Sequence, residues 1–321
     1  MPAKIEDPVT SGVAPAATPS DRSIGDVINS STRTLHTALN KLIIGRLRLA
    51  LPPQANDCSP YVHGMIHISS IYVAFESAWE TVLDSDPVSS TTTLTPRMRA
   101  ILSDLHMEKL ARAGALKADL RVMTRWSQAK VAEIISETAA RVPVLDDFVS
   151  HINRTVAAKP HVLVAYAWVL YMALFAGGRY IRGSFERIDP ASEFWYAIEA
   201  VQSLSDDEDG DEEDELAHEA DVGGSRRAMP GSFPAPAKQR TLDTPPLDFF
   251  RFATPEDGAD LKKEFKAKLA GAQFEYVERE DIVAEAQEIF KRMIAVVGCI
   301  DEALGTADEG KDGANAAAGM V

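Results

Sequence analysis

The feature that most constrains the fold is a continuous apolar run, Val162 to Ala176 (VLVAYAWVLYMALFA), which ends at Gly177 and Gly178. A segment without polar positions must be buried, either in a protein core or in a bilayer. The run is shorter than the roughly 20 residues that a membrane-spanning helix needs. We therefore expect a buried helix in a soluble protein without a membrane anchor.

The segments around this run repeat apolar residues at helical spacing. A first helix is expected from Ser23, which is placed to cap it together with Asp26, up to the Pro52-Pro53 pair. No useful length of sequence alternates polar and apolar residues as a strand does, and no internal repeat is found, so the fold class is all-α. Further helices are expected from Met65 to Asp84, from Ile101 to Trp126 and on to Ala140, from Asp146 to Val156, from Pro160 through the apolar run, from Ala191 to Leu204, and from Ala259 to Leu304.

A strongly acidic segment interrupts this helical pattern. The net charge is −15, and DDEDGDEEDE between Asp206 and Glu215 supplies much of it. Like charges repel each other and bury no apolar surface, so residues 205–246 are expected to be a disordered insertion in one helical domain, 21–204 and 247–305. A protein-interaction segment or a linker between two domains is the alternative. Residues 1–20 and 306–321 are expected to be disordered tails.

Composition excludes several classes of protein. There is no basic face for nucleic acid, and the first residues lack the basic and apolar regions of a secretory signal. The two cysteines, Cys58 and Cys299, have no paired spacing, so neither a disulfide framework nor a thiolate metal site is indicated. A reducing compartment, the cytoplasm, fits best.

One of the seven histidines has an informative position. His36 lies one position round from the apolar face of the first helix, so its ring can point into a crevice beside the core. A neutral imidazole there can ligate haem iron, although an ordinary core or surface histidine is the alternative. His63 and His67 would share a helix face, but they lack the further ligands of a metal site.

Five blocks of the sequence, in the same order, resemble the haem oxygenase family. They are Leu35 to Thr37 (LHT), Ser70 to Glu76 (SIYVAFE), Leu110 to Leu120 (LARAGALKADL), Tyr166 to Arg179 (YAWVLYMALFAGGR), and, after the acidic segment, Asp248 to Phe252 (DFFRF) with Leu261 to Lys266 (LKKEFK). Each block alone is a weak signal, whereas their common order is specific.

The resemblance implies a haem clamped between the first helix and the apolar helix, with His36 as the proximal iron ligand. Glycines in the apolar helix would allow its backbone to approach the flat ring, and cations would bind the carboxylates of the propionates. Lys262 and Lys266 are four residues apart, so they share one face of their helix. The implied haem-binding residues are His36, Arg33, Trp168, Gly177, Gly178, Lys262 and Lys266.

The apolar helix departs from the family pattern at the positions that matter for chemistry. Leu174 replaces the aspartate that holds the water network steering oxygen to the ring, and Ala173 replaces the preceding glycine. Trp168 stands where tyrosine is usual, and Leu170 where arginine is usual. Leucine neither donates nor accepts hydrogen bonds.

Two functions of the resembling family therefore compete. The first is oxidative cleavage of haem to biliverdin, carbon monoxide and ferrous iron, with oxygen and electrons from an NADPH-linked reductase. The second is a non-degrading haem-binding or haem-sensing protein on the same fold, which the apolar Leu174 favours. A haem-free interaction protein is a third possibility. Absorbance after haem addition, followed by a search for bile pigment, distinguishes them.

Overall fold

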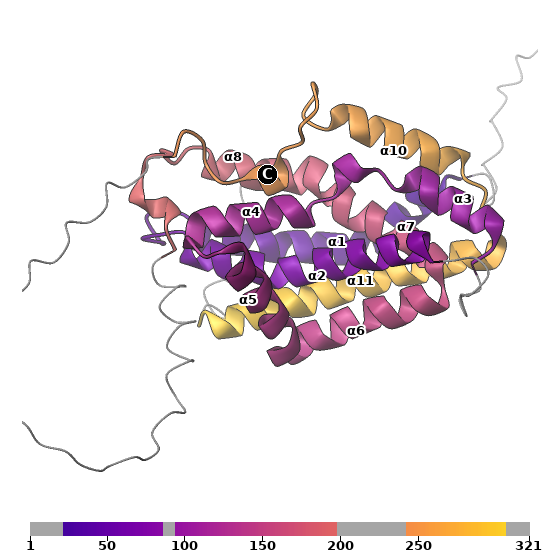
Figure 1. Cartoon of the computed structure of the whole chain (residues 1–321), viewed down its shortest axis with the longest axis horizontal. Coiled ribbons are helices and arrows are strands. Elements are labelled where there is room, and N and C mark those ends of the chain that lie inside the picture. The colour runs from indigo at the N-terminus through magenta and orange to yellow at the C-terminus, as the bar shows by residue number, and fades with distance from the viewer. Residues whose placement is uncertain (1–21, 86–93, 198–241, 306–321) are drawn as a thin grey trace, which may run out of the picture.

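The computed structural model describes residues 22–85, 94–197 and 242–305, and all regular elements in these ranges are helical. The expected all-α fold class is thus confirmed. The acidic run and both expected tails lie outside the described residues. Helices α1, α2, α6 and α11 run along the long axis of the molecule (Figure 1).

The first helix, α1 (Ile24–Leu49), begins where the sequence predicts. The Ser23 hydroxyl oxygen accepts a hydrogen bond from the Asp26 backbone N–H at 3.2 Å, and the same hydroxyl donates to the Asp26 carboxylate at 2.7 Å. Capping satisfies an N–H that the first turn would otherwise leave unpaired. Ile28 and Leu39 face the core, and α1 packs along α11 (Tyr276–Ala303).

Helix α2 (Ser59–Asp84) is the central helix of the bundle. Ile71, Phe75 and Trp79 on it are fully buried, at 0–1% exposure. It packs against α4 (Ala113–Thr124), α5 (Gln128–Arg141) and α6 (Pro143–Ala158). The predicted segments from Met65 to Asp84 and from Asp146 to Val156 are therefore helical.

The predicted continuous helix from Ile101 to Ala140 is wrong. The chain forms α3 (Pro96–Leu105), a short 3₁₀ turn η1 (Glu108–Leu110), α4 and α5 instead. Arg125 ends α4 in the left-handed region, with φ of 61°, and the Ser127 hydroxyl then caps α5 by accepting from the Lys130 N–H. These end signals were hidden because the apolar spacing carries on across the breaks.

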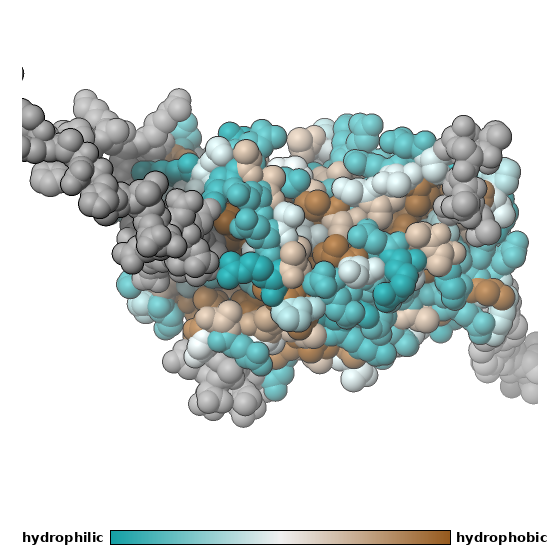
Figure 2. Space-filling view, turned by 60° about the horizontal axis from the view of Figure 1, so that its bottom comes forward, coloured by the Kyte–Doolittle hydropathy of each residue, from teal (hydrophilic) through white to brown (hydrophobic). Residues whose placement is uncertain are grey.

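The apolar run lies in one helical stretch, Pro160–Phe185, made of η2 (Pro160–Val162), α7 (Leu163–Tyr166), the π-helical turns η3 (Ala167–Tyr171) and η4 (Leu174–Gly178), and α8 (Arg179–Phe185). We call it the apolar helix. It is long and apolar enough to cross a membrane by composition, yet 67% of its most apolar window is buried inside the protein. The face in Figure 2 is mostly hydrophilic, with hydrophobic side chains in separate patches.

Two further predicted helices differ in the structure. Within the Ala191–Leu204 prediction, the described part is a 3₁₀ turn, η5 (Glu193–Trp195), and residues from 198 onward lie outside the described ranges. The last segment forms two helices, α10 (Ala259–Gly271) and α11, because Glu275 and Glu278 form a capping box that starts α11 anew.

The chain rejoins the bundle beside the apolar helix after the acidic segment. Pro246, at the end of the predicted insertion, is buried, and the 3₁₀ turn η7 (Asp248–Phe250) follows it. The buried Asp119 carboxylate of α4 accepts hydrogen bonds from the backbone N–H groups of Asp248, at 3.0 Å, and Phe249, at 2.8 Å. This anchor places the phenylalanines of η7 against the apolar helix.

Candidate functional site

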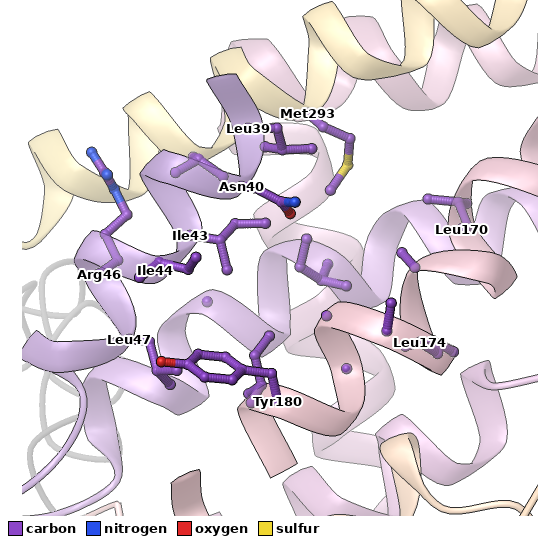
Figure 3. Close-up of a pocket in the computed structure, with 18 of the residues that line it drawn as sticks. Leu39, Asn40, Ile43, Ile44, Arg46, Leu47, Leu170, Leu174, Tyr180 and Met293 are labelled. Carbon is purple, nitrogen blue, oxygen red and sulfur yellow. The ribbon is translucent and has the colours of Figure 1, made fainter. Parts of the chain in front are cut away.

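A large cavity lies between α1 and the apolar helix. Its volume is about 1250 Å³, above the roughly 300–1,000 Å³ of ordinary small-molecule pockets. The start of α2, η7, α10 and the second half of α11 complete its walls. Figure 3 shows side chains of α1 such as Ile43 facing Leu174 and Leu170 of the apolar helix across the open centre.

The α1 wall carries the predicted iron ligand. His36 lines the cavity and is exposed, and its ring meets the buried Phe290 ring of α11 edge to face, with centroids 5.7 Å apart. Asn40, one turn further along α1, points its amide into the same space (Figure 3). Among the described residues, this amide has no hydrogen-bonding partner. The structure thus brings an imidazole and an unpaired amide together on one wall.

The opposite wall includes a patch of bare backbone and small side chains. Ala173, Ala176 and Gly177 are exposed toward the cavity, and a Cβ atom added at Gly177 would meet no atom within 4 Å. Gly178 has a different role, because its added Cβ would lie 3.0 Å from the Phe250 ring. Of the two predicted glycines, Gly177 gives a flat ligand access to the backbone, and Gly178 allows η7 to pack against the helix.

The four departures from the family pattern, Trp168, Leu170, Ala173 and Leu174, line this wall as well. Leu174 lines the cavity and is only 4% exposed, whereas Trp168 is 8% exposed. The Trp168 indole N–H donates to the Asn29 side-chain oxygen of α1 at 3.0 Å, and its ring packs on Gly25. Trp168 therefore joins the two walls at one end of the cavity, with its only polar group already satisfied.

Three cations line the cavity at this same end. Lys266 Nζ lies 5.5 Å from the Trp168 ring centroid, and Lys262 Nζ lies 5.8 Å from that of Phe175. Lys262, Lys266 and Arg33 all line the cavity, and none of them makes an ion pair with any described residue. Burial, together with the nearby charges of Lys266 and Arg179, lowers the pKa of Lys262. Such a cluster attracts anions, carboxylates included.

A buried carboxylate behind the cavity holds the apolar helix in place. Glu76 accepts hydrogen bonds from the backbone N–H groups of Arg112, at 2.7 Å, and Ala113, at 3.0 Å, and from the Tyr171 hydroxyl, at 3.2 Å. Burial raises the pKa of Glu76, and these donors partly offset the rise. The Tyr72 hydroxyl donates to the carbonyl of Leu170 in the π-helical stretch, at 2.9 Å.

Several residues that line the cavity were not among those predicted from the sequence, namely Asn40, Ile43, Leu47, Gly64, Tyr180 and Phe290. Those on α1 lie in the turns that follow His36, so helical spacing from His36 would have found them. Those on other helices meet His36 only through tertiary packing.

The alternative histidine pair, His63 and His67, lies on α2. His67 Nδ1 is hydrogen-bonded to the backbone carbonyl of His63 at 2.8 Å, and burial lowers the pKa of both rings. In the described ranges no group of three or more His, Cys, Asp or Glu side chains could hold a metal ion.

The sequence profile of the heme oxygenase family matches residues 26–298, which includes both walls of the cavity. The chain belongs to the haem oxygenase family. The heme-binding protein HMX1 of Saccharomyces cerevisiae is 27% identical over 180 residues, and this match covers 53% of the chain and 52% of the yeast protein. The alignment thus spans about half the length of this curated relative.

Solved haem oxygenases share the fold at low sequence identity. Heme oxygenase-2 from Synechocystis sp. PCC 6803, crystallised with heme and NO, aligns with a TM-score of 0.58 and 15% identity, over 89% of this chain and 88% of that one. Heme oxygenase 2 from Chlamydomonas reinhardtii, solved without heme, gives 0.57 and 15%, over 87% and 98%. At such identity the match concerns the fold alone.

Proposed function

We propose that this protein binds haem in the cavity between α1 and the apolar helix, with His36 as the axial ligand of the iron. One observation carries the proposal: an imidazole, a patch of bare backbone and three cations without an ion pair among the described residues border one largely apolar cavity. The yeast relative is named a heme-binding protein, which supports the same ligand. We also propose a cytoplasmic location.

The residues present fit haem. The volume of about 1250 Å³ is ample, and the open space above Gly177 suits a flat ring. Lys262, Lys266 and Arg33 would bind the two propionates, whose negative charge would offset the burial and the neighbouring positive charges that lower the Lys262 pKa. Asn40 would accept a hydrogen bond from the ring N–H of His36 that faces away from the iron, as metal-bound histidines commonly require.

For activity, we propose haem cleavage to biliverdin, carbon monoxide and ferrous iron, with oxygen and electrons from an NADPH-linked reductase. Bound haem would supply both the oxygen-activating iron and the ring that is opened. In the chain itself, the apolar helix would exclude water and Trp168 would fix the distance between the walls. Proton delivery is the step that the apolar helix does not support at position 174, because Leu174 has no polar atom.

A non-degrading haem carrier or sensor is the second candidate, and the buried Leu174 favours it. The two candidates share the binding site and differ in the fate of the haem after its iron is reduced. Adding a reductant and oxygen to the haem complex distinguishes them, because only a degrading enzyme converts the Soret band into bile-pigment absorbance.

The binding proposal is tested by haem titration of the full chain. We expect His36→Ala to weaken haem binding by at least about 100-fold and to shift the Soret band, because the iron loses its protein ligand. His63→Ala is the matched control, since His63 does not line the cavity and should leave the spectrum unchanged. An unaltered Soret band and affinity in His36→Ala would reject His36 as the ligand.

A further inference from the structure

The cavity is longer than a haem. Its lining residues on α1 run from Ile28 to Ala50, and His36 lies nearer to the first of these. At 1.5 Å rise per residue, Leu47 is about 16 Å and Ala50 about 21 Å along the helix from His36. A porphyrin with iron above His36 does not reach that far in any orientation. A part of the cavity, which we call the arm, therefore remains beyond the ring.

The arm is apolar. Ile44 and Leu47 of α1, Gly64 and Met65 of α2, and Tyr180 and Ile181 of α8 line it. Figure 3 shows the Tyr180 side chain reaching from α8 toward Leu47, so that it bridges the two sides of the arm. Arg46 points away toward α11, where it pairs with Asp301.

The space in the arm is open down to the backbone of α2. A Cβ atom at Gly64 would meet no atom within 4 Å, although Gly64 lies inside a helix. Glycine in a helix interior costs roughly 0.5–1 kcal/mol relative to alanine. Gly64 lines the cavity, so the open space above its Cα belongs to the arm.

The two ends of the cavity differ in chemistry. Lys262, Lys266 and Arg33 border one end and make no ion pairs with described residues, whereas the arm at the other end offers apolar side chains. This asymmetry suits an amphiphile with carboxylates at one edge and a long apolar chain at the opposite edge. Haem carries its propionates on two neighbouring pyrroles, so a long substituent on the remote edge would extend away from the cations.

We propose that the arm binds the isoprenoid chain of a prenylated haem, which makes prenylated haem a preferred ligand of this site. The inference rests on the proposed haem-binding function and specifies the class of haem. Contacts between the isoprenoid chain and Ile44, Leu47 and Tyr180 would add to the binding free energy that the porphyrin and the propionates supply.

The test compares two haems on the full chain, protohaem and a haem with the same propionates and a hydroxyethylfarnesyl chain, both titrated from the same detergent solution. We expect the farnesylated haem to bind at least about 10-fold more tightly, since burial of two methylene groups already changes a dissociation constant by roughly that factor. Equal affinities would overturn the proposal while leaving protohaem binding intact.

A substitution that fills the arm tests whether the isoprenoid chain binds there. Gly64→Phe should remove the preference for the farnesylated haem and leave protohaem affinity within about twofold, because the added ring enters open space. Gly114→Phe is the matched control: this glycine of α4 is exposed, also has no atom within 4 Å of an added Cβ, and does not line the cavity. A preference that survives Gly64→Phe would overturn the placement in the arm.

Two more outcomes complete the design. If neither haem binds, the proposed function fails, and this inference with it. If palmitate displaces protohaem, and Gly64→Phe blocks that displacement, the arm serves free fatty acids and the prenylated-haem proposal is wrong. Resistance of both haem complexes to palmitate, combined with the preference for the farnesyl chain, supports it.

Discussion

The two walls of the cavity differ in the number of polar groups that they present to it. The α1 wall presents His36, Arg33 and Asn40, each with a polar group that has no side-chain partner among the described residues. The apolar helix presents Ala173, Ala176 and Gly177, and its one nearby indole N–H is already bonded to Asn29. One wall is equipped to hold a charged metal complex, and the other to exclude water from it.

We therefore expect ligand binding and oxygen chemistry to depend on separate parts of the fold. An axial ligand and propionate partners are sufficient to bind haem, whereas ring cleavage requires protons at defined positions on the far side of the ring. Substitutions on α1 and α10 should therefore change affinity, and substitutions on the apolar helix should change turnover.

The largest effect is expected from introducing a carboxylate in place of Leu174 on the apolar helix. The unmodified protein should convert haem to biliverdin more slowly than about 1 per second, the lower end for typical enzymes. Leu174→Asp combined with Ala173→Gly should raise the yield of bile pigment, measured by absorbance with reductant and oxygen, because a carboxylate can orient water. Burying it should cost about 1–3 kcal/mol of stability.

Leu174→Ala with the same glycine is the control for added space. It enlarges the cavity without supplying a polar atom, so it should leave the pigment yield unchanged. Rapid biliverdin formation by the unmodified chain would instead show that the apolar wall already delivers protons by another route.

The next effect concerns the cationic end of the cavity. Lys262→Glu or Lys266→Glu should weaken haem binding by about 10-fold or more and reduce its salt dependence, because each replaces an attraction to a propionate by a repulsion. Haem dimethyl ester, which lacks the propionate charges, should bind the unmodified protein and both variants with the same affinity. Affinity should also fall on raising the pH sooner than for an ordinary lysine, since the Lys262 pKa is lowered.

Equal losses with haem and its dimethyl ester would mean that the lysines stabilise the fold of α10 and do not contact propionates. Lys263→Glu is a matched surface variant. This lysine lies between the other two in sequence, is exposed, and does not line the cavity, so its reversal should leave haem affinity nearly unchanged.

A smaller effect is expected at the anchor that places η7 on the apolar helix. Burial raises the pKa of Asp119 to about 7, from 3.8, although two backbone N–H donors oppose the rise. A raised pKa favours the protonated form in the folded state, so this contribution is complete below about pH 4 and is lost as the pH rises through 7. Chemical denaturation from pH 5 to 8 should show it.

Asp119→Asn should remove that part of the pH dependence and lower stability by about 1–3 kcal/mol, since the amide can keep only one oxygen acceptor. Haem affinity should change little, because the α1 wall is untouched. If the pH profiles of the variant and the unmodified chain were parallel, Asp119 would not titrate in this range.

The smallest effect is expected from deleting residues 205–241. Their composition cannot form a packed core, so helical circular dichroism and cooperative thermal unfolding should persist. Residues 242–246 are kept because Pro246 is buried and the Pro245 carbonyl accepts from Arg251. A broad, non-cooperative transition in the deleted chain would show that both walls depend on this segment.

The sequence by itself determined the helical class and the polar character of α1. The apolar positions of α1 recur at helical spacing, and Ser23 marks its start, so local chemistry fixed both the helix and the face on which His36 lies. The apolar run identified a buried helix for the same reason. Short-range signals of this kind depend only on neighbours in the chain.

Only the tertiary structure decided which surfaces meet across the cavity. The break at Arg125, the separate start of α11 at Glu275, and the different roles of Gly177 and Gly178 depend on backbone angles, caps and distant rings such as Phe250. The arm above Gly64 is lined by residues of three helices, α1, α2 and α8, which only tertiary packing brings together. Packing between distant segments leaves little trace in local periodicity, so the sequence could predict candidate residues for the site but not the shape of the space that they share.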